Sequence, residues 1–329
     1  MQIGPFELAE TVLESAVGPT YSAVDQRFGR KRWVTVATVG PERRSIALAA
    51  IRADIAKLER HAHESILRPL EAGVWDERLI VVHDPPSAKP LREFLDDGAK
   101  RGEPMVRLSA VLPADTIRVA GFIRNLGKVV GACHAQDVVH GFVSPECVFV
   151  RPPGNALLFG AGLSALLAPR RDDADAMRYL APEVLRSGAA GAVKRTDVYG
   201  LGMVAYECFT LRRPFEDMDA EDLLDAKRTV GPTSMLDLKP NLSPHVVIAV
   251  EAAIKPHATL RRLNPDSFGT VLADVDMADK NPYTVRRSLM RPEATRSPSW
   301  PWLWFWWWDS VVEVFFIGIY ALVRLFTKF

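Results

Sequence analysis

The sequence predicts an α+β protein with a small strand-rich part, a larger helical part and a separate hydrophobic C-terminal helix. Three observations support this division. Residues 1–90 contain runs rich in β-branched and aromatic side chains, residues 91–278 contain long stretches with helical periodicity, and residues 302–326 are dominated by tryptophan and other apolar residues. We therefore expect two lobes with a cleft between them, followed by a linker over residues 279–301, where prolines interrupt regular structure.

The composition is that of a globular protein without a strongly charged partner. The chain has 329 residues, of which 48% are hydrophobic, and its 41 basic and 40 acidic residues give a formal net charge of +1. This balance argues against nucleic acid as a partner. Cys133, Cys147 and Cys208 lack metal-binding or CxxC spacing and lie among apolar neighbours, which predicts buried free thiols in a reducing compartment.

Three segments define the strand-rich part. "YSAVDQRFGRKRWVTVATVG" has β-rich runs on both sides of a turn, which predicts a hairpin with a basic tip. A solvated loop is the favoured interpretation of that tip, over a phosphate-binding or lipid-binding patch. The apolar run "LIVVHD" predicts a buried strand, and "SIALAAIRADIAKLERHA" predicts a helix. The buried face of that helix should carry Ile46, Ala50, Ile51, Ile55 and Leu58.

Two long segments define the helical part. "DTIRVAGFIRNLGKVVGACHAQ" predicts an amphipathic helix with Asp115 as its N-cap. "TDVYGLGMVAYECFTL" is apolar almost all round, and this pattern predicts a helix that is buried in the core.

Four motifs in order resemble those of a protein kinase of the serine/threonine type, over residues 1 to about 278. "VVHGFVSPECVFV" is similar to the catalytic loop, and "LLFGAGLS" lies where the metal-binding DFG segment is expected. "YLAPEVL" is similar to the end of the activation segment, and "TDVYGLGMVAYECFTLRRPF" to the long core helix of the large lobe. The resemblance implies a bilobal fold with a β-rich N-lobe over residues 1–90 and a helical C-lobe over residues 91–278, but it does not by itself imply an activity.

The resemblance also implies where the residues for phosphoryl transfer should lie. In this family a lysine contacts the phosphates, an aspartate orients the hydroxyl group, a second lysine neutralises developing charge, and an asparagine and an aspartate bind the metal. The corresponding positions of this sequence are, in that order, Ala37, Phe142, Ser144, Cys147 and Gly160. None of these side chains is a charged group, and a soft thiol does not replace hard oxygen ligands for Mg²⁺.

The Gly-rich loop is depleted in the same way, because its three glycine positions are occupied by Leu13, Ser15 and Gly18. From these departures the sequence predicts a catalytically inactive pseudokinase that is not an enzyme, without a cofactor or a metal site. ATP binding should also be disfavoured, because four apolar side chains lie near the expected nucleotide site: Phe142, Phe149, Leu158 and Phe159.

Four polar residues of the family's framework remain and are expected to be structural: Asp54, His140, Glu183 and Asp197. Asp197 should bond the backbone of the catalytic-loop segment, and Glu183 should pair with Arg261 or Arg262, because a buried carboxylate without a partner is costly. His140 should join Leu58 in a packed spine between the lobes. Asp54 corresponds to the helix partner of the missing lysine and is expected to have lost its partner.

The C-terminal segment has the length and composition of a membrane anchor. Residues 302–323 number 22, or about 33 Å as a helix, which is enough to cross a hydrocarbon core. Tryptophan at high density suits the headgroup zone. The residues expected to meet lipid or a partner are Trp302, Trp304, Trp306, Trp307, Trp308, Asp309, Glu313 and Arg324.

Asp309 and Glu313 share one face of this helix, and acids within a membrane are costly unless they are paired or hydrated. Three arrangements follow: a span whose acidic face meets a polar or cationic partner subunit, a shorter span beginning near Ser310, or a helix lying flat in the interface. A single-pass span is favoured. The basic linker and the short C-terminal exit "TKF" would place the kinase-like domain on the cytoplasmic side.

The sequence therefore predicts a membrane-tethered scaffold, regulatory or structural subunit of a membrane-associated complex. Its expected partners are membrane lipid and a protein, either a membrane complex or an active kinase. Two alternatives are an atypical ATP-dependent transferase and a kinase-like domain that senses a ligand.

Overall fold

The computed structural model describes residues 1–101, 116–152, 154–169 and 173–273. The chain divides into two units, Met1–Met290 and Arg291–Phe329, and the second lies outside the described residues. The predictions for Asp115, for the linker and for the tryptophan-rich tail also lie outside them. Within the described ranges, none of the helices combines the length and the hydropathy that a membrane span requires.

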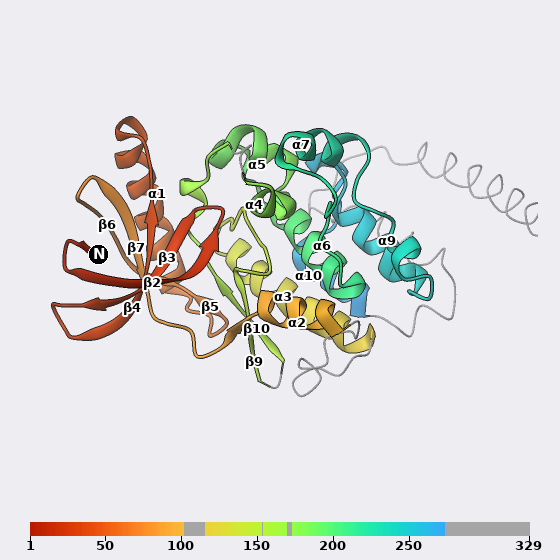
Figure 1. The fold of residues 1–329 in the computed structure, drawn as a ribbon, viewed down its shortest axis with the longest axis horizontal. Coiled ribbons are helices and arrows are strands. Elements are labelled where there is room, and N and C mark those ends of the chain that lie inside the picture. Colours follow the sequence, from red (N-terminus) through yellow and green to blue (C-terminus); the bar gives the residue numbers. More distant parts are fainter. Residues whose placement is uncertain (102–115, 153, 170–172, 274–329) are drawn as a thin grey trace, which may run out of the picture. The chain divides into compact units, whose positions relative to one another are not determined.

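The first part of the chain forms a sheet with the strand order β1-β2-β3-β4-β7-β6 (Figure 1). These strands are β1 (Gln2–Ile3), β2 (Phe6–Ser15), β3 (Gly18–Asp25), β4 (Arg30–Ala37), β6 (Pro69–Trp75) and β7 (Arg78–His83). The predicted hairpin is confirmed, because β3 pairs antiparallel with β4 and Tyr21 lies opposite Val34. The predicted buried strand is β7, whose residues from Leu79 to His83 are all buried.

Helix α1 (Pro41–Arg60) accompanies this sheet and contacts β6. Its buried residues are Ala47, Ile51, Ile55 and Leu58. The prediction for Ile46 and Ala50 was wrong, since both are exposed and Ile46 is 70% accessible. The reason is geometric: around the helix axis Ile46 lies about 140° from Ile51, whereas Ala47 lies only about 40° from it.

A second, smaller sheet joins the two parts of the chain. Its strand order is β5-β10-β9-β8, and its members are β5 (Ile66–Leu67), β8 (Lys89–Pro90), β9 (Val148–Arg151) and β10 (Asn155–Phe159). Strand β10 pairs in parallel with β5 from the first part and antiparallel with β9, which contains the last residues of the catalytic-loop motif. The sheet therefore ties the motif-bearing loop to the N-terminal part.

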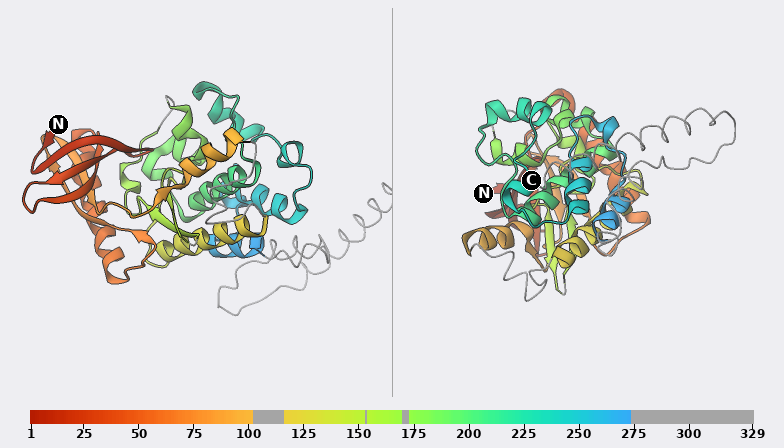
Figure 2. Two further views of the ribbon diagram at one scale, coloured as in Figure 1. Left: turned by 60° about the horizontal axis from the view of Figure 1, so that its bottom comes forward. Right: turned by 90° about the vertical axis from the view of Figure 1, so that its right-hand side faces the viewer.

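The remaining described residues form the helical part, seen from two further sides in Figure 2. The α-helices are α2 (Leu91–Arg101), α3 (Thr116–His134), α4 (Ala174–Tyr179), α5 (Pro182–Ser187), α6 (Lys194–Thr210), α7 (Ala220–Thr229), α8 (Met235–Leu238), α9 (Pro244–Ala253) and α10 (Pro265–Ala273). Short 3₁₀ turns are η2 (Ser164–Leu166), η3 (Gly188–Gly191) and η4 (Ala258–Leu260).

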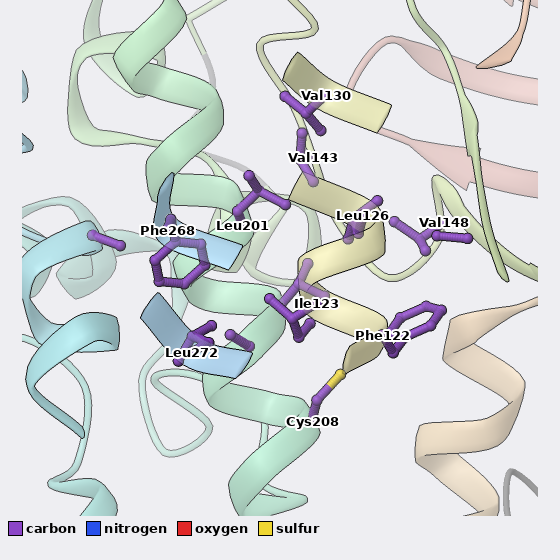
Figure 3. Close-up of a cluster of buried hydrophobic side chains, with 14 of the residues drawn as sticks. Phe122, Ile123, Leu126, Val130, Val143, Val148, Leu201, Cys208, Phe268 and Leu272 are labelled. Atoms are coloured by element: carbon purple, nitrogen blue, oxygen red, sulfur yellow. The ribbon is translucent and has the colours of Figure 1, made fainter. Parts of the chain in front are cut away.

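Helix α6 is the centre of the helical core, as its uniformly apolar sequence predicts. Every residue from Thr196 to Thr210 is buried. Side chains of α3 and α10 pack against it, with Ile123 of α3 and Phe268 of α10 near Leu201 of α6 (Figure 3). The three cysteines are free and buried, which confirms the prediction for their thiols. The segment of residues 138–147, which belongs to the candidate site, is bound to this core through α6.

Candidate functional site

One buried carboxylate holds the segment between α3 and β9, residues 138–147, which we call the loop segment. Asp197, in the first turn of α6, is fully buried and accepts hydrogen bonds from the backbone N–H groups of His140 (3.0 Å) and Gly141 (2.6 Å). Its Oδ2 also lies 2.6 Å from Nε2 of His134. Because a buried carboxylate needs several partners, this arrangement fixes the loop backbone firmly to the core helix.

Immediately after this anchor, Phe142 and Gly160 are packed against each other. Phe142 is 2% exposed, and its ring centroid lies 4.3 Å from that of His140. Gly160 has φ +92°, and a Cβ built on it would lie only 2.8 Å from Cζ of Phe142. The phenyl ring thus occupies the space into which a side chain at position 160 would project. The two positions complement each other in volume, and neither provides a carboxylate.

This complementarity predicts the effect of adding one methyl group. Gly160→Ala should lower the free energy of unfolding by about 1–3 kcal/mol, because alanine is strained at positive φ and its Cβ would overlap the Phe142 ring. Urea denaturation measures the change. In the double variant with Phe142→Leu, the penalty for Gly160→Ala should be smaller. If the two substitutions prove additive, the proposed contact does not contribute to the cost.

Cys147 and Ser144 form a small neutral pair at the end of the loop segment. The Ser144 hydroxyl donates to Sγ of Cys147 at 3.6 Å, and the Cys147 N–H donates to the Ser144 carbonyl oxygen at 3.0 Å. Complete burial raises the pKa of the Cys147 thiol to about 12. The thiol is therefore protonated at neutral pH, and it is neither a nucleophile nor a ligand for a hard cation in that state.

Ala37 and Asp54 occupy the positions of the family's lysine and its helix partner. Ala37 is 2% exposed and lies at the end of β4 opposite Leu79 of β7. As expected, Asp54 has no lysine at position 37 to pair with, but Nζ of Lys57 lies 2.7 Å from its Oδ1. Lys57 is one turn further along α1, so an i,i+3 pair within the helix takes the place of the family's pair between strand and helix.

Aromatic rings fill the space between the first sheet and β9–β10. We call Trp33, His83, Phe149 and Phe159 the cleft aromatic cluster. The Trp33 ring lies 5.7 Å from that of Phe149 and 5.9 Å from that of Phe159, and the His83 ring lies 4.5 Å from that of Phe159. Leu13 and Leu157 join the same buried group. The cluster connects both lobes through apolar contact.

Two of the four apolar side chains predicted near the nucleotide site, Phe149 and Phe159, belong to this cluster. Phe142 packs instead on His140 and Gly160, and Leu158 packs in the helical core. Successive side chains of a strand point to opposite faces, so Leu158 and Phe159 cannot both face the cleft. Trp33 and His83 were not assigned to the cleft from the sequence. For Trp33 a signal was present, because every second residue of a strand points to the same face and Trp33 therefore shares a face with Thr35 and Ala37.

His83 is a buried polar group without hydrogen bonds. The residue is 1% exposed, and neither ring nitrogen has a hydrogen-bond partner among the described residues. Burial lowers the pKa of the imidazole to about 3, so His83 is neutral at physiological pH. A neutral, unsatisfied imidazole costs stability, and its lowered pKa should also make the folded domain sensitive to acid.

An ion pair to a fully buried arginine holds the activation-segment motif "YLAPEVL". Glu183, in the first turn of α5, accepts two hydrogen bonds from the guanidinium group of Arg261. Arg261 is fully buried, and its Cζ lies 4.7 Å from the centroid of the Tyr199 ring. Of the two candidate partners for Glu183, Arg262 is exposed and Arg261 makes the pair.

Sequence reasoning missed a further polar network on the helical part. Arg92 of α2 contacts Glu146 of the loop segment at 2.8 Å and Glu207 of α6 at 2.6 Å, and Tyr179 donates its hydroxyl hydrogen to Glu207. Burial raises the pKa of the Glu207 carboxyl, and the nearby Arg92 opposes this rise. A single acid within the apolar run of α6 was the available signal for this network.

The fold and the anchored loop define a protein kinase domain, and the family model described as "Protein kinase domain" matches residues 16–256. The chain therefore belongs to the protein kinase family. It is 27% identical over 227 residues to CBL-interacting protein kinase 25 of Oryza sativa subsp. japonica, covering 67% of this chain and 41% of that protein. It is 25% identical over 289 residues to the serine/threonine-protein kinase PknA of Mycobacterium tuberculosis, covering 85% of this chain and 63% of that protein.

The matches thus span less than two thirds of the length of these relatives. Among solved structures, the kinase domain of Mycobacterium tuberculosis PknI aligns with a TM-score of 0.57 and 18% identity, covering 83% of this chain and 96% of that chain. At this identity the likeness concerns the fold alone. It agrees with the bilobal arrangement of a β-rich N-lobe and a helical C-lobe.

These relationships correct one prediction. From the side chains at the five cleft positions, the sequence predicted that the chain is not an enzyme. The matching family model and relatives named as kinases point instead to an enzyme. The prediction was wrong because it derived a function from groups that are absent, and the loss of known groups does not determine what the remaining residues do.

Proposed function

We propose that this kinase-family domain serves as a regulatory or scaffolding subunit of a membrane-associated complex. The observation that carries the proposal is the cleft aromatic cluster, in which Trp33 of one lobe packs on Phe149 and Phe159 of the other. Two carboxylates, the buried Asp197 and the half-buried Glu183, fix the neighbouring segments. A domain held together in this way presents a constant shape, which is what a binding surface requires.

The proposed attachment is the tryptophan-rich segment at residues 302–326. Its support is the sequence, which has 22 residues between Trp302 and Val323 and six tryptophans from Trp300 to Trp308. A span and an interfacial helix both fit this composition, and the basic linker would keep the kinase domain on the cytoplasmic side. Asp309 and Glu313 favour a protein partner, because a polar or cationic group on that partner would compensate their charge.

Purification of the full-length chain in a gentle detergent, with identification of the proteins that accompany it, tests this proposal. The double variant Asp309→Ala/Glu313→Ala should release a membrane partner while the kinase domain stays folded. Asp279→Ala/Glu293→Ala removes the same charge from the linker and should retain the partner. Recovery of a monomer without partners in several detergents would contradict the proposal.

A second candidate is an ATP-dependent transferase, which membership of the kinase family favours. A measurement of ATP binding distinguishes this candidate from the scaffold proposal. We expect the melting temperature to change by less than about 1 °C at millimolar ATP, with or without magnesium, because weak binding adds little stability. The physical reason is that the cleft positions offer the phosphates no charged side chain.

A saturable, magnesium-dependent rise in melting temperature would support the transferase candidate. So would transfer of radiolabel from ATP that disappears when a cleft residue is replaced. A rise produced by an uncharged compound and not by ATP would support a ligand-sensing domain.

A further inference from the structure

The tip of the β3–β4 hairpin holds an exposed aromatic ring on a well-ordered turn. Phe28 is 67% exposed. The backbone N–H groups of Phe28 and Gly29 both donate to the Asp25 carbonyl oxygen, and the Arg27 N–H donates to Oδ1 of Asp25. The Arg27 guanidinium group lies over the Phe28 ring, with Cζ 5.5 Å from its centroid. The ring is therefore held in solvent by the turn around it, where its apolar surface is available for contact.

In the described part of the structure, two cations at the tip are without a partner, whereas each nearby acid has one. Three acids are near it, and each is already engaged: Arg27 binds Asp25 and Glu71, and the Gln26 amide donates to Glu7. The next two residues along the hairpin, Arg30 and Lys31, are exposed, and neither side chain has an ion-pair or hydrogen-bond partner within the described part of the chain. A phenyl ring flanked by two free cations is complementary to a surface that is apolar beneath a layer of negative charge.

We propose that this hairpin tip, Phe28 with Arg30 and Lys31, is a second membrane contact that docks the N-lobe on an anionic lipid surface. Phe28 would enter the interface, and the two cations would lie among the headgroups. The inference rests on the proposed attachment through the C-terminal segment, which would keep the domain near a bilayer. The 28 residues from 274 to 301 could span at most about 100 Å, which is ample for the N-lobe to reach the membrane.

The docking has a definite consequence for the domain. Strand β4 continues from the tip to Trp33 and Ala37 at the cleft, so a contact at the tip would fix the orientation of the cleft relative to the membrane. The complex proposed above would then meet one defined face of the domain. A single attachment at the C-terminus would leave that orientation free.

The test uses the full-length chain inserted into nanodiscs of phosphatidylcholine alone or enriched in phosphatidylserine. Val24 lies opposite Lys31 in the β3–β4 pair and is 37% exposed, and the three native cysteines are buried, so a fluorophore on Val24→Cys reports on the tip. Quenching by spin-labelled lipid should be strong in the anionic discs and weak in neutral ones. High salt should reduce it.

Two variants separate the apolar and charged contributions. Phe28→Ser should abolish quenching, and Arg30→Glu/Lys31→Glu should reduce the docked population by about fivefold or more for each cation lost. Arg124→Glu/Lys128→Glu makes the same change in charge on α3 and should have no effect. Equal quenching in neutral and anionic discs, or no effect of either tip variant, would overturn the proposal. A response of the label to soluble polyglutamate and to neither lipid would assign the tip to an acidic protein and overturn it as well.

The experiment distinguishes insertion of the C-terminal segment from docking of the hairpin tip. A chain that does not insert into discs contradicts the proposed attachment. In that event the labelled chain is mixed with vesicles of the same two compositions, and quenching by the anionic vesicles alone still supports the tip as a lipid contact. A chain that inserts but shows no quenching leaves the attachment intact and contradicts the inference about the tip.

Discussion

Glu183→Ala is expected to lower the free energy of unfolding by about 3–5 kcal/mol, because it leaves the charge of a fully buried arginine without its partner. Arg261 donates two hydrogen bonds to this one carboxylate, and its remaining partners are the backbone carbonyl oxygens of Lys255, Pro256 and Arg195. Carbonyl dipoles stabilise a guanidinium group, but they do not neutralise it. The substitution also removes the nearer of the two acceptors of the Thr196 hydroxyl and leaves the Gly191 carbonyl oxygen.

Arg262→Ala is the matched control for this prediction. It lies beside Arg261 in sequence and is exposed, so its loss should change stability by about 0.5 kcal/mol or less. Urea unfolding of both variants, followed by far-ultraviolet circular dichroism, gives the comparison. Similar small losses in the two variants would show that the Glu183–Arg261 pair contributes little beyond its neighbouring contacts.

The sequence was sufficient for the fold because the framework residues form local and recognisable patterns. The almost uniformly apolar run of α6 predicts a buried helix, and the two β-rich runs around a turn predict a hairpin. Four motifs in the order of the kinase family then fix how these elements are connected. The order of motifs could not reveal whether the domain is an enzyme, and there the prediction was wrong.

The details of the site depended on pairings that periodicity does not encode. Arg92 and Glu207 are 115 positions apart, so the acid within the apolar run of α6 indicates a buried partner but not which residue it is. Asp54 pairs with Lys57 of its own helix, and position 37 is alanine and cannot pair with it. Leu158 and Phe159 are adjacent and equally apolar, so only the direction of the strand decides which of them enters the cleft.

His83 should make the domain sensitive to acid. Its pKa of about 3 in the folded chain lies below the ordinary value near 6.5 that it regains on unfolding. Between these values the unfolded chain binds a proton that the folded chain does not, so stability falls as the pH falls. The loss should be absent above pH 6.5 and should amount to about 2 kcal/mol by pH 5, since one pH unit within the window corresponds to about 1.4 kcal/mol. His140, which is also fully buried with a lowered pKa, adds a loss of the same sign.

Two substitutions isolate the contribution of His83. His83→Leu removes both the titration and the two unsatisfied nitrogens, so it should reduce the pH dependence to the part that His140 contributes and raise stability at pH 7.5 by about 1–3 kcal/mol. His83→Gln cannot titrate but keeps polar atoms in the apolar cluster, so it should reduce the dependence equally without the gain at pH 7.5. Urea unfolding of the three proteins from pH 7.5 to pH 5 provides the measurement. If all three lose the same stability over that range, His83 is not the group responsible. That result would indicate that the pKa of His83 is not lowered. The imidazole beside Phe159 would then be hydrogen-bonded by solvent, because a solvated ring keeps its ordinary pKa.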